Sequence, residues 1–393
     1  MIVNNDVTEL GYLSINHDKE ELCGDNVQVI RPSEDCCILV LADGLGSGVK
    51  ANILATLTSK MIATMMANNL SIDDCVRTVA ETLPVCKVRG VAYSTFTLIK
   101  IKENRFVDIY NYDNPMPFML RDGKYYPLST STITIDGKII THSSVEVQEY
   151  DTFFLLSDGV VHAGIGASLN FGWNLNEIID FVEGMYNKDY SSKSLATFLI
   201  DHVNGLYASH PGDDATVACL RIREREQVNL LIGPATNRED DEKMMSLFFS
   251  KEGKHIISGG TTSHVAADYL HRELTYGLDY VDKDIPPTAK IDGVDLVTEG
   301  VITLNKVLYY SKNLLNENNS EYFNWSYKKD GASQISKLLF EEATDINFYV
   351  GCAINPAHQQ EGVQLAFKTK MQIVEELSKS LKEMGKKIKV SLF

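Results

Sequence analysis

The sequence predicts an α+β protein with two domains. The first is a four-layer α-β-β-α sandwich of antiparallel sheets flanked by helices, and the second is a smaller α/β domain. Three observations support this. The chain has 393 residues, which is too long for one domain of about 150 residues. Residues 1–223 are rich in short strand-like runs with few helical patterns, whereas strands and helices alternate in residues 228–393.

The strands of the first domain follow from local patterns. Residues 38–42 form a short apolar run, typical of a buried strand. Residues 93–102 alternate polar and apolar side chains, and 106–112 follow after a short turn, so we expect a hairpin. Asp-Gly pairs between strand-forming residues predict turns at 122–123 and 136–137. Two further candidate strands are 152–157 and 215–220.

Three helices are expected in the same region, at 48–68, 176–186 and 193–207. The first carries one apolar stripe of Ile53, Leu57, Met61 and Met65. Its methionines are typical of side chains that fill gaps in a core.

A charged run at residues 221–227 is the expected domain boundary, although a solvated edge strand would look similar. Beyond it we expect a strand at 228–232, a helix at 240–249, a strand at 255–257 and a helix at 263–273. The chain then ends with a helix and a short strand. The apolar stripes of these last two elements are Val374, Leu377, Leu381 and Met384, and then Ile388, Val390 and Leu392.

The composition excludes several classes of protein. The formal net charge is −16, which argues against nucleic acid as a partner because phosphate binding needs a basic surface. The 7 cysteines are odd in number and lack a CxxC pair, so we expect reduced thiols rather than disulfides. The first residues do not resemble a signal peptide, and no apolar run is long enough to cross a membrane. We therefore expect a cytoplasmic protein.

Acidic residues stand next to four of the apolar strands. Asp43 directly follows the strand at 38–42, and Asp158 follows the one at 152–157. Asp213 opens the strand at 215–220, and Asp25 precedes an apolar run at 27–30. Each Asp taken alone fits an ordinary turn or cap. The four together fit a cluster at one rim of the sandwich, where several carboxylates stay ionised only with a cation such as Mg²⁺ or Mn²⁺.

These motifs resemble those of metal-dependent (PPM-type) serine/threonine phosphatases. The resemblance is carried by Gly24-Asp25 and by three segments at 41–48, 156–159 and 213–217, in this order. The segment Asp113-Asn-Pro-Met-Pro117 is similar to the bacterial branch typified by the sporulation stage II protein E phosphatase. The resemblance covers residues 8–222.

The resemblance implies a role for each acidic residue. Asp43 would bridge two Mn²⁺ or Mg²⁺ ions, and the carbonyl of Gly44 would bind one of them. Asp158 and Asp213 would hold the other ion, and Asp25 would bind directly or through water. The two ions would activate a bridging water that attacks a phosphoserine or phosphothreonine.

The resemblance also leaves one role open and suggests partners. Leu45 occupies the position of a His that animal-type members carry as a candidate general acid, so the acid is unassigned. In the bacterial branch the usual substrates are phosphorylated regulators of the anti-anti-sigma type. A homodimer is likewise implied by the resemblance alone. In the same branch, helices next to the metal site act as regulatory switches and dimer contacts, which is the alternative role for the helix at 48–68.

The second domain resembles no family, and we expect a regulatory or ligand-binding role for it. Gly259, Gly260, Thr261 and Thr262 lie between an expected strand and an expected helix. This pattern is typical of a phosphate-binding helix N-terminus, although Ser and Thr are also ordinary N-caps.

Two alternatives to the phosphatase remain. The first domain could be a catalytically silent scaffold, with the second binding a phosphorylated ligand or protein partner. The second domain could instead act catalytically on a phosphorylated small molecule. The four carboxylates Asp25, Asp43, Asp158 and Asp213 are all present, which favours an active phosphatase.

Overall fold

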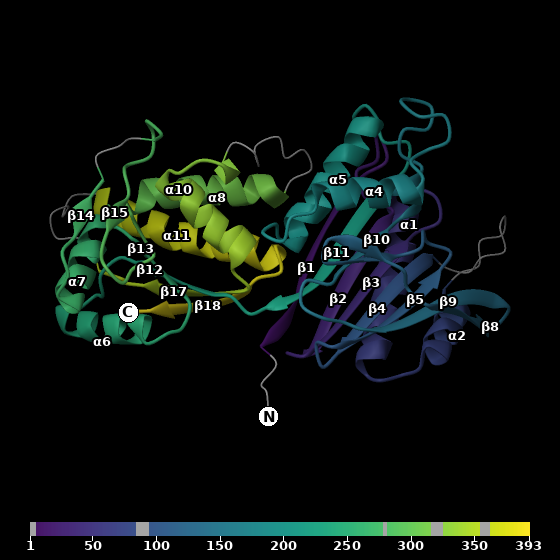
Figure 1. Cartoon of the computed structure of the whole chain (residues 1–393), viewed down its shortest axis with the longest axis horizontal. Helices are drawn as coiled ribbons and strands as arrows, with labels where there is room; N and C mark the ends of the chain where they lie inside the picture. Colours follow the sequence, from purple (N-terminus) through teal and green to yellow (C-terminus); the bar gives the residue numbers. More distant parts are fainter. Residues whose placement is uncertain (1–4, 84–93, 278–280, 316–324, 354–361) are drawn as a thin grey trace. The chain divides into compact units, whose positions relative to one another are not determined.

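The computed structural model describes residues 5–83, 94–277, 281–315, 325–353 and 362–393. The chain forms two compact units, Met1–Glu224 and Arg225–Phe393, shown in Figure 1. Within the described residues, no helix combines the length and apolar character needed to cross a membrane. The six cysteines in this part of the chain are free thiols.

The first unit contains two antiparallel sheets. The five-stranded sheet has the order β1-β11-β10-β6-β7 and the six-stranded sheet the order β2-β3-β4-β5-β9-β8. The strands of the first sheet are β1 (Asp6–Ile15), β11 (Ala215–Glu224), β10 (Thr152–Leu156), β6 (Phe118–Arg121) and β7 (Lys124–Tyr126). Those of the second are β2 (Asp25–Ser33), β3 (Cys36–Asp43), β4 (Thr95–Lys102), β5 (Phe106–Tyr112), β9 (Lys138–Glu146) and β8 (Thr130–Ile135).

Helices cover the outer face of each sheet, which confirms the predicted four-layer sandwich. Alternate residues of a strand point to opposite faces. Leu39 of β3 and Phe153 of β10 therefore share the core between the sheets, while Ile38 packs toward α1 (Gly48–Ala67) and α2 (Ile72–Thr82). Phe154 packs toward α4 (Leu175–Met185) and α5 (Ser192–Leu206). Both faces of β3 and β10 are buried, which explains their continuous apolar runs.

Helix α1 buries a different face from the predicted one. Ile53 and Leu57 are 50% and 42% exposed, whereas the buried face carries small residues such as Ala51 and Ala55. Small side chains let the helix backbone approach closely: a Cβ on Gly44 would lie 2.1 Å from the Ala51 carbonyl oxygen. Close packing at the end of β3 thus decides the orientation of α1, against the larger apolar stripe.

The methionines of α1 pack in or against the hydrophobic core, which agrees with the predicted gap-filling role. Met66 is buried in the core beneath the helix, and Met61 and Met65 pack against the edge of the same core.

The charged run at 221–227 is mostly part of a strand. Strand β11 continues to Glu224 and pairs with β1 along its whole length. Arg221 is fully buried, and its guanidinium donates to one carboxylate oxygen of Glu9 at 3.1 Å, while Arg223 donates to the other at 3.1 Å. The first arginines of the run therefore form an internal ion network, not a solvated edge.

The second unit is an α/β domain around one seven-stranded sheet of order β14-β15-β16-β13-β12-β17-β18. Strands β16, β13, β12, β17 and β18 are parallel neighbours. The strands are β12 (Gln227–Ile232), β13 (Lys254–Ser258), β14 (Thr275–Tyr276), β15 (Ala289–Lys290), β16 (Leu296–Thr298), β17 (Asp345–Val350) and β18 (Lys387–Leu392). The order of the five parallel strands is that of a doubly wound fold.

Two groups of helices accompany this sheet (Figure 1). Helices α6 (Arg238–Phe249) and α7 (Gly260–Leu270) share a core with β12 and β13. Helix α8 (Val301–Leu315) contacts both α10 (Gly331–Ser336) and α11 (Gly362–Glu383), and these three helices also contact β13, β16 and β18, respectively. Helix α7 begins at Gly260, three residues before the predicted start at 263, so Gly260 to Thr262 form its first turn.

Candidate metal centre

Asp25 and Asp43 face each other across two paired strands. Asp25 begins β2, Asp43 ends β3, and the antiparallel register places the two residues directly opposite. The Asp25 side chain is buried, and neither of its oxygens accepts a hydrogen bond within the described residues. Neither carboxyl therefore has the role of an ordinary turn residue.

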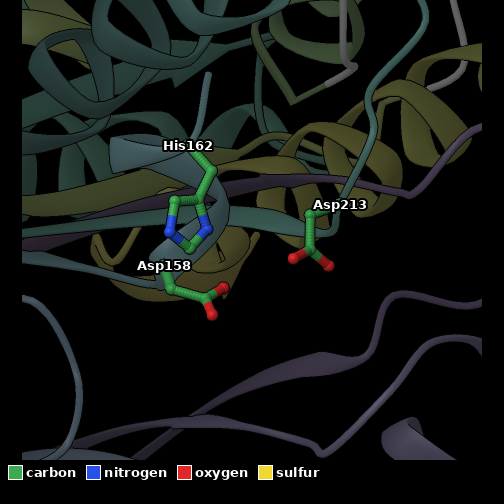
Figure 2. A group of neighbouring side chains, drawn as sticks. All are labelled: Asp158, His162 and Asp213. Carbon is green, nitrogen blue, oxygen red and sulfur yellow. The ribbon is translucent and has the colours of Figure 1, made fainter. Parts of the chain in front are cut away.

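Asp158, His162 and Asp213 form a second group at the end of the other sheet. Asp158 begins the short helix α3 (Asp158–Val161) directly after β10, and the backbone N–H of His162 donates to its carbonyl at 2.9 Å. Asp213 comes from the loop before β11, the strand that pairs with β10. One ligand atom from each side chain lies within 4.8 Å of the others, and Figure 2 shows the imidazole next to the Asp158 carboxylate.

Asp43 connects the two groups. Burial raises the pKa of Asp43, and the nearby charges of Asp25, Asp158 and Asp213 raise it further. The structure thus brings Asp25, Asp43, Asp158 and Asp213 to one rim of the first unit, with Gly44 next to Asp43.

Asp214 belongs to this rim as well, although the sequence analysis selected only its neighbour. One oxygen of Asp214 accepts a hydrogen bond from the backbone of His17 at 2.9 Å. The other, Oδ2, is buried without a hydrogen-bond partner in the described structure, and a Cβ on Gly24 would lie only 2.6 Å from it. Asp214 therefore lies over Gly24, next to Asp25.

The sequence analysis did not select His162 or Asp214, and of these two only His162 could have been found from the sequence. It lies one helical turn after Asp158, a spacing that places two ligands on one side of a helix. For Asp213 and Asp214, the sequence offers no means of telling which carboxylate faces which neighbour.

The electrostatics of the rim favour a bound cation. Burial raises the pKa of Asp25 to about 8, with the charges of Asp214 and Asp158 adding to the effect and the hydroxyls of Ser157 and Thr216 opposing it. Burial, followed by the neighbouring carboxylates, raises the pKa of Asp43 to about 9. Burial and Asp158 likewise raise the pKa of Asp213. Each ionised carboxylate here is destabilised by burial and by its neighbours, and a positive ion would relieve both effects.

The residues present fit Mn²⁺ or Mg²⁺. The donors are carboxylate oxygens with one imidazole, and hard divalent cations prefer oxygen ligands. The buried Asp25 and Asp214 oxygens that lack hydrogen bonds are available to such an ion. The rim is also tightly built, because a Cβ on Gly159 would lie 2.1 Å from the Asp214 carbonyl oxygen.

The segment at 113–117 contacts the strands that lead to this rim. The Asn114 side chain is buried, accepts from the Thr95 hydroxyl at 2.5 Å and donates to the Leu41 carbonyl at 3.5 Å. It thereby contacts β3 two residues before Asp43.

Two antiparallel sheets between helices, with this acidic rim, define a PPM-type phosphatase domain. Residues 33–223 match the family model described as stage II sporulation protein E (SpoIIE). The match confirms the resemblance to this branch of phosphatases that the motifs predicted.

Several solved structures are similar in fold. The phosphatase domain of the cell fate determinant SpoIIE from Bacillus subtilis, in a crystal form without domain swapping, is 16% identical with a TM-score of 0.44, and the match covers 56% of this chain and 94% of that one. RsbX in complex with magnesium is 18% identical with a TM-score of 0.38, covering 55% and 96%. The catalytic domain of the phosphatase PstP in complex with two manganese ions is 15% identical with a TM-score of 0.38, covering 56% and 99%. No curated protein sequence matches this chain significantly.

Proposed function

We propose that the first unit is a metal-dependent phosphoprotein phosphatase that hydrolyses phosphoserine and phosphothreonine. The observation that carries this proposal is the convergence of carboxylates from separate strands at one rim, where the buried Asp25 oxygens have no hydrogen-bond partner among the described residues. An acidic rim alone would repel a phosphorylated substrate. Catalysis there requires a cation that reverses the local charge, and the match to the SpoIIE family model supports the same interpretation.

We assign each carboxylate a separate role in binding the two ions. Asp43 would bind two ions, with the Gly44 carbonyl as a further donor, because Asp25 and Asp158 both act on its carboxyl. Asp158 and Asp213 would hold one of these ions, and His162 is placed next to them. Bound there, two Mn²⁺ or Mg²⁺ ions would supply an activated water for in-line attack on the phosphoryl group.

We further propose that the substrate is a phosphorylated regulatory protein, of the anti-anti-sigma type, and that the second unit regulates or targets the phosphatase. The match of residues 33–223 to the SpoIIE family model supports a signalling role. A homodimer is part of the same proposal.

The test is hydrolysis of p-nitrophenyl phosphate and a phosphothreonine peptide, with Mn²⁺, with Mg²⁺ and with EDTA. We expect metal-dependent activity that Asp43→Asn lowers at least about a hundredfold, because even residues behind a metal ligand typically contribute ten- to a hundredfold. Asp73→Asn, an exposed acid on α2, is the control and should keep full activity.

A calorimetric Mn²⁺ titration of the same proteins separates the alternatives. Binding that Asp43→Asn abolishes, without hydrolysis of either substrate, would indicate a phosphatase that awaits an activator. No Mn²⁺ binding by the wild-type protein would refute the metal centre and favour the silent scaffold whose second unit binds a phosphorylated ligand or partner.

A further inference from the structure

Four strands of the second unit end at the same level of the sheet. Ile232 of β12 pairs with Ser258 of β13 and with Val350 of β17, and Ser258 pairs with Thr298 of β16. The residues that follow these strand ends are Gly233, Gly259, Glu299 and Gly351. In open α/β sheets, ligands bind at this edge where the strand order reverses, which here is between β12 and β17.

Helix α7 begins at this edge without a cap. Gly259 precedes the helix with φ +131° and ψ +130°, a backbone conformation that glycine adopts readily and other residues do not. Among the described residues no side chain caps the helix. The N–H groups of its first turn, from Gly260 to Thr262, have no partner inside the helix. Such N–H groups and the helix dipole attract a phosphate.

A buried hydroxyl faces the same turn. The Thr262 side chain is fully buried, and its Oγ1 makes no hydrogen bond within the described residues. A Cβ on Gly259 would lie 3.1 Å from this oxygen, so the hydroxyl is directed at the turn before α7. A buried hydroxyl without a partner costs free energy, and a phosphate oxygen bound at the turn would remove that cost.

A lysine lies at the neighbouring strand ends. Lys370 of α11 donates to the Gly351 carbonyl, and its Nζ is 2.8 Å from the position that a Cβ on Gly233 would occupy. Gly233 has φ +78°, and a Cβ on Gly351 would lie 2.0 Å from the Pro234 carbonyl oxygen. Burial lowers the pKa of Lys370, so an anion nearby would stabilise its charged form.

Glu299 lies near the same turn, and its carboxylate would need hydrogen-bond donors from the ligand that inorganic phosphate does not offer. One of its carboxylate oxygens accepts a hydrogen bond from the Ile302 backbone at 3.2 Å, and a Cβ on the next residue, Gly300, would lie 3.4 Å from Gly259 Cα. A carboxylate next to a phosphate site fits a ligand that offers hydroxyl donors beside its phosphate, as a ribose does.

We propose that the second unit binds a nucleoside phosphate at this edge, with the phosphate on Gly260, Thr261 and Thr262, Lys370 as a cation and Glu299 on the ribose. The inference does not depend on the phosphatase activity of the first unit.

The test is isothermal titration calorimetry on the full chain carrying Asp43→Asn, in EDTA, so that the metal centre does not contribute. The probes are AMP, ADP, ATP, GTP, ribose 5-phosphate and inorganic phosphate. We expect at least one nucleotide to bind with a Kd below about 1 mM, and at least about tenfold more tightly than inorganic phosphate.

Three variants locate the site. Gly260→Asp places a carboxylate in open space at a helix N-terminus, where it favours the helix but repels phosphate; nucleotide affinity should fall at least about tenfold with no loss of thermal stability. Gly260→Ala is the matched control and should bind normally. Thr262→Val removes only the buried hydroxyl and should weaken binding about tenfold without lowering thermal stability.

Three outcomes would overturn the proposal. One is the absence of binding by every probe at about 5 mM. Another is binding that Gly260→Asp and Thr262→Val leave unchanged. The third is inorganic phosphate that binds as tightly as any nucleotide, which would remove the role of Glu299 and the nucleoside.

Discussion

Cation binding to the first unit should release nearly two protons at neutral pH. Burial and neighbouring carboxylates raise the pKa of Asp25 to about 8 and that of Asp43 to about 9. Both carboxyls therefore carry a proton at pH 7 in the metal-free protein, and a divalent cation must displace these protons to bind. Carboxyls with an ordinary pKa would release none.

The size of the effect follows from the two pKa values. At pH 7 a group of pKa 8 is about 0.9 protonated and one of pKa 9 about 1.0, so about 1.9 protons leave. At pH 8.5 the corresponding fractions are about 0.2 and 0.8, and only about 1.0 proton leaves. The release should thus fall by about half over this range.

The assay is calorimetric titration of Mn²⁺ in weakly chelating buffers of different ionisation enthalpy. The slope of the observed enthalpy against the buffer ionisation enthalpy gives the number of protons released. Asp25→Asn removes one titrating group and should lower the slope at pH 7 by about one. Asp73→Asn, exposed on α2, should leave it unchanged.

A slope near zero at pH 7 for the wild-type protein would refute the reasoning. It would mean that the rim is hydrated enough for both carboxylates to be ionised before the cation binds. A slope that stays the same at pH 8.5 would equally contradict the assignment of the two protons to Asp25 and Asp43.

Three further predictions concern stability and selectivity. The metal-free protein should lose stability as the pH rises from about 5 to 9, because the native state keeps protons on Asp25 and Asp43 that the unfolded chain loses near the ordinary pKa of 3.8; calorimetric unfolding with and without Mn²⁺ checks this, and Mn²⁺ should remove the dependence. His162→Gln should weaken Mn²⁺ binding about tenfold and Mg²⁺ binding much less, because Mg²⁺ prefers oxygen ligands; titration with each metal measures the difference. Glu9→Gln should lower the free energy of unfolding by about 3 kcal/mol, because it leaves Arg221 buried without its carboxylate, and urea denaturation measures the loss.

Each of these has a result that would contradict it. A metal-free unfolding temperature that rises with pH would reverse the sign argued for the raised carboxyls. Equal losses of Mn²⁺ and Mg²⁺ affinity in His162→Gln would remove the imidazole from the ligand set. A Glu9→Gln protein no less stable than Asp73→Asn, whose ion pair is exposed and screened by water, would show that the buried network contributes little.

Much of the fold was predictable because burial follows local periodicity. The apolar runs before Asp43 and Asp158 are strands buried on both faces, and such strands show no alternation. The Asp-Gly turns at 122–123 and 136–137 join β6 to β7 and β8 to β9 as predicted. The same periodicity failed for α1, because close packing against Gly44 selects small residues over the larger apolar stripe.

The candidate site was predictable in position but not in composition. Acidic residues next to interior strands indicated the rim, since strand ends of two stacked sheets meet there. Asp214 could not be distinguished from Asp213, because its orientation depends on a hydrogen bond from His17, 197 residues away in the chain. The buried Arg221 was interpreted as a boundary for the same reason: its partner, Glu9, comes from a distant strand.

The sequence by itself determined many of the strands and helices, the acidic residues that follow the interior strands, and the family model that residues 33–223 match. These properties depend on neighbours along the chain, which set turn chemistry and the period of burial. Only the tertiary structure decided which carboxylates share the rim, that His162 joins them, and that the glycines and Lys370 of the second unit meet at one sheet edge. Those arrangements depend on side-chain directions that distant segments fix by packing and hydrogen bonding, and no local pattern records them.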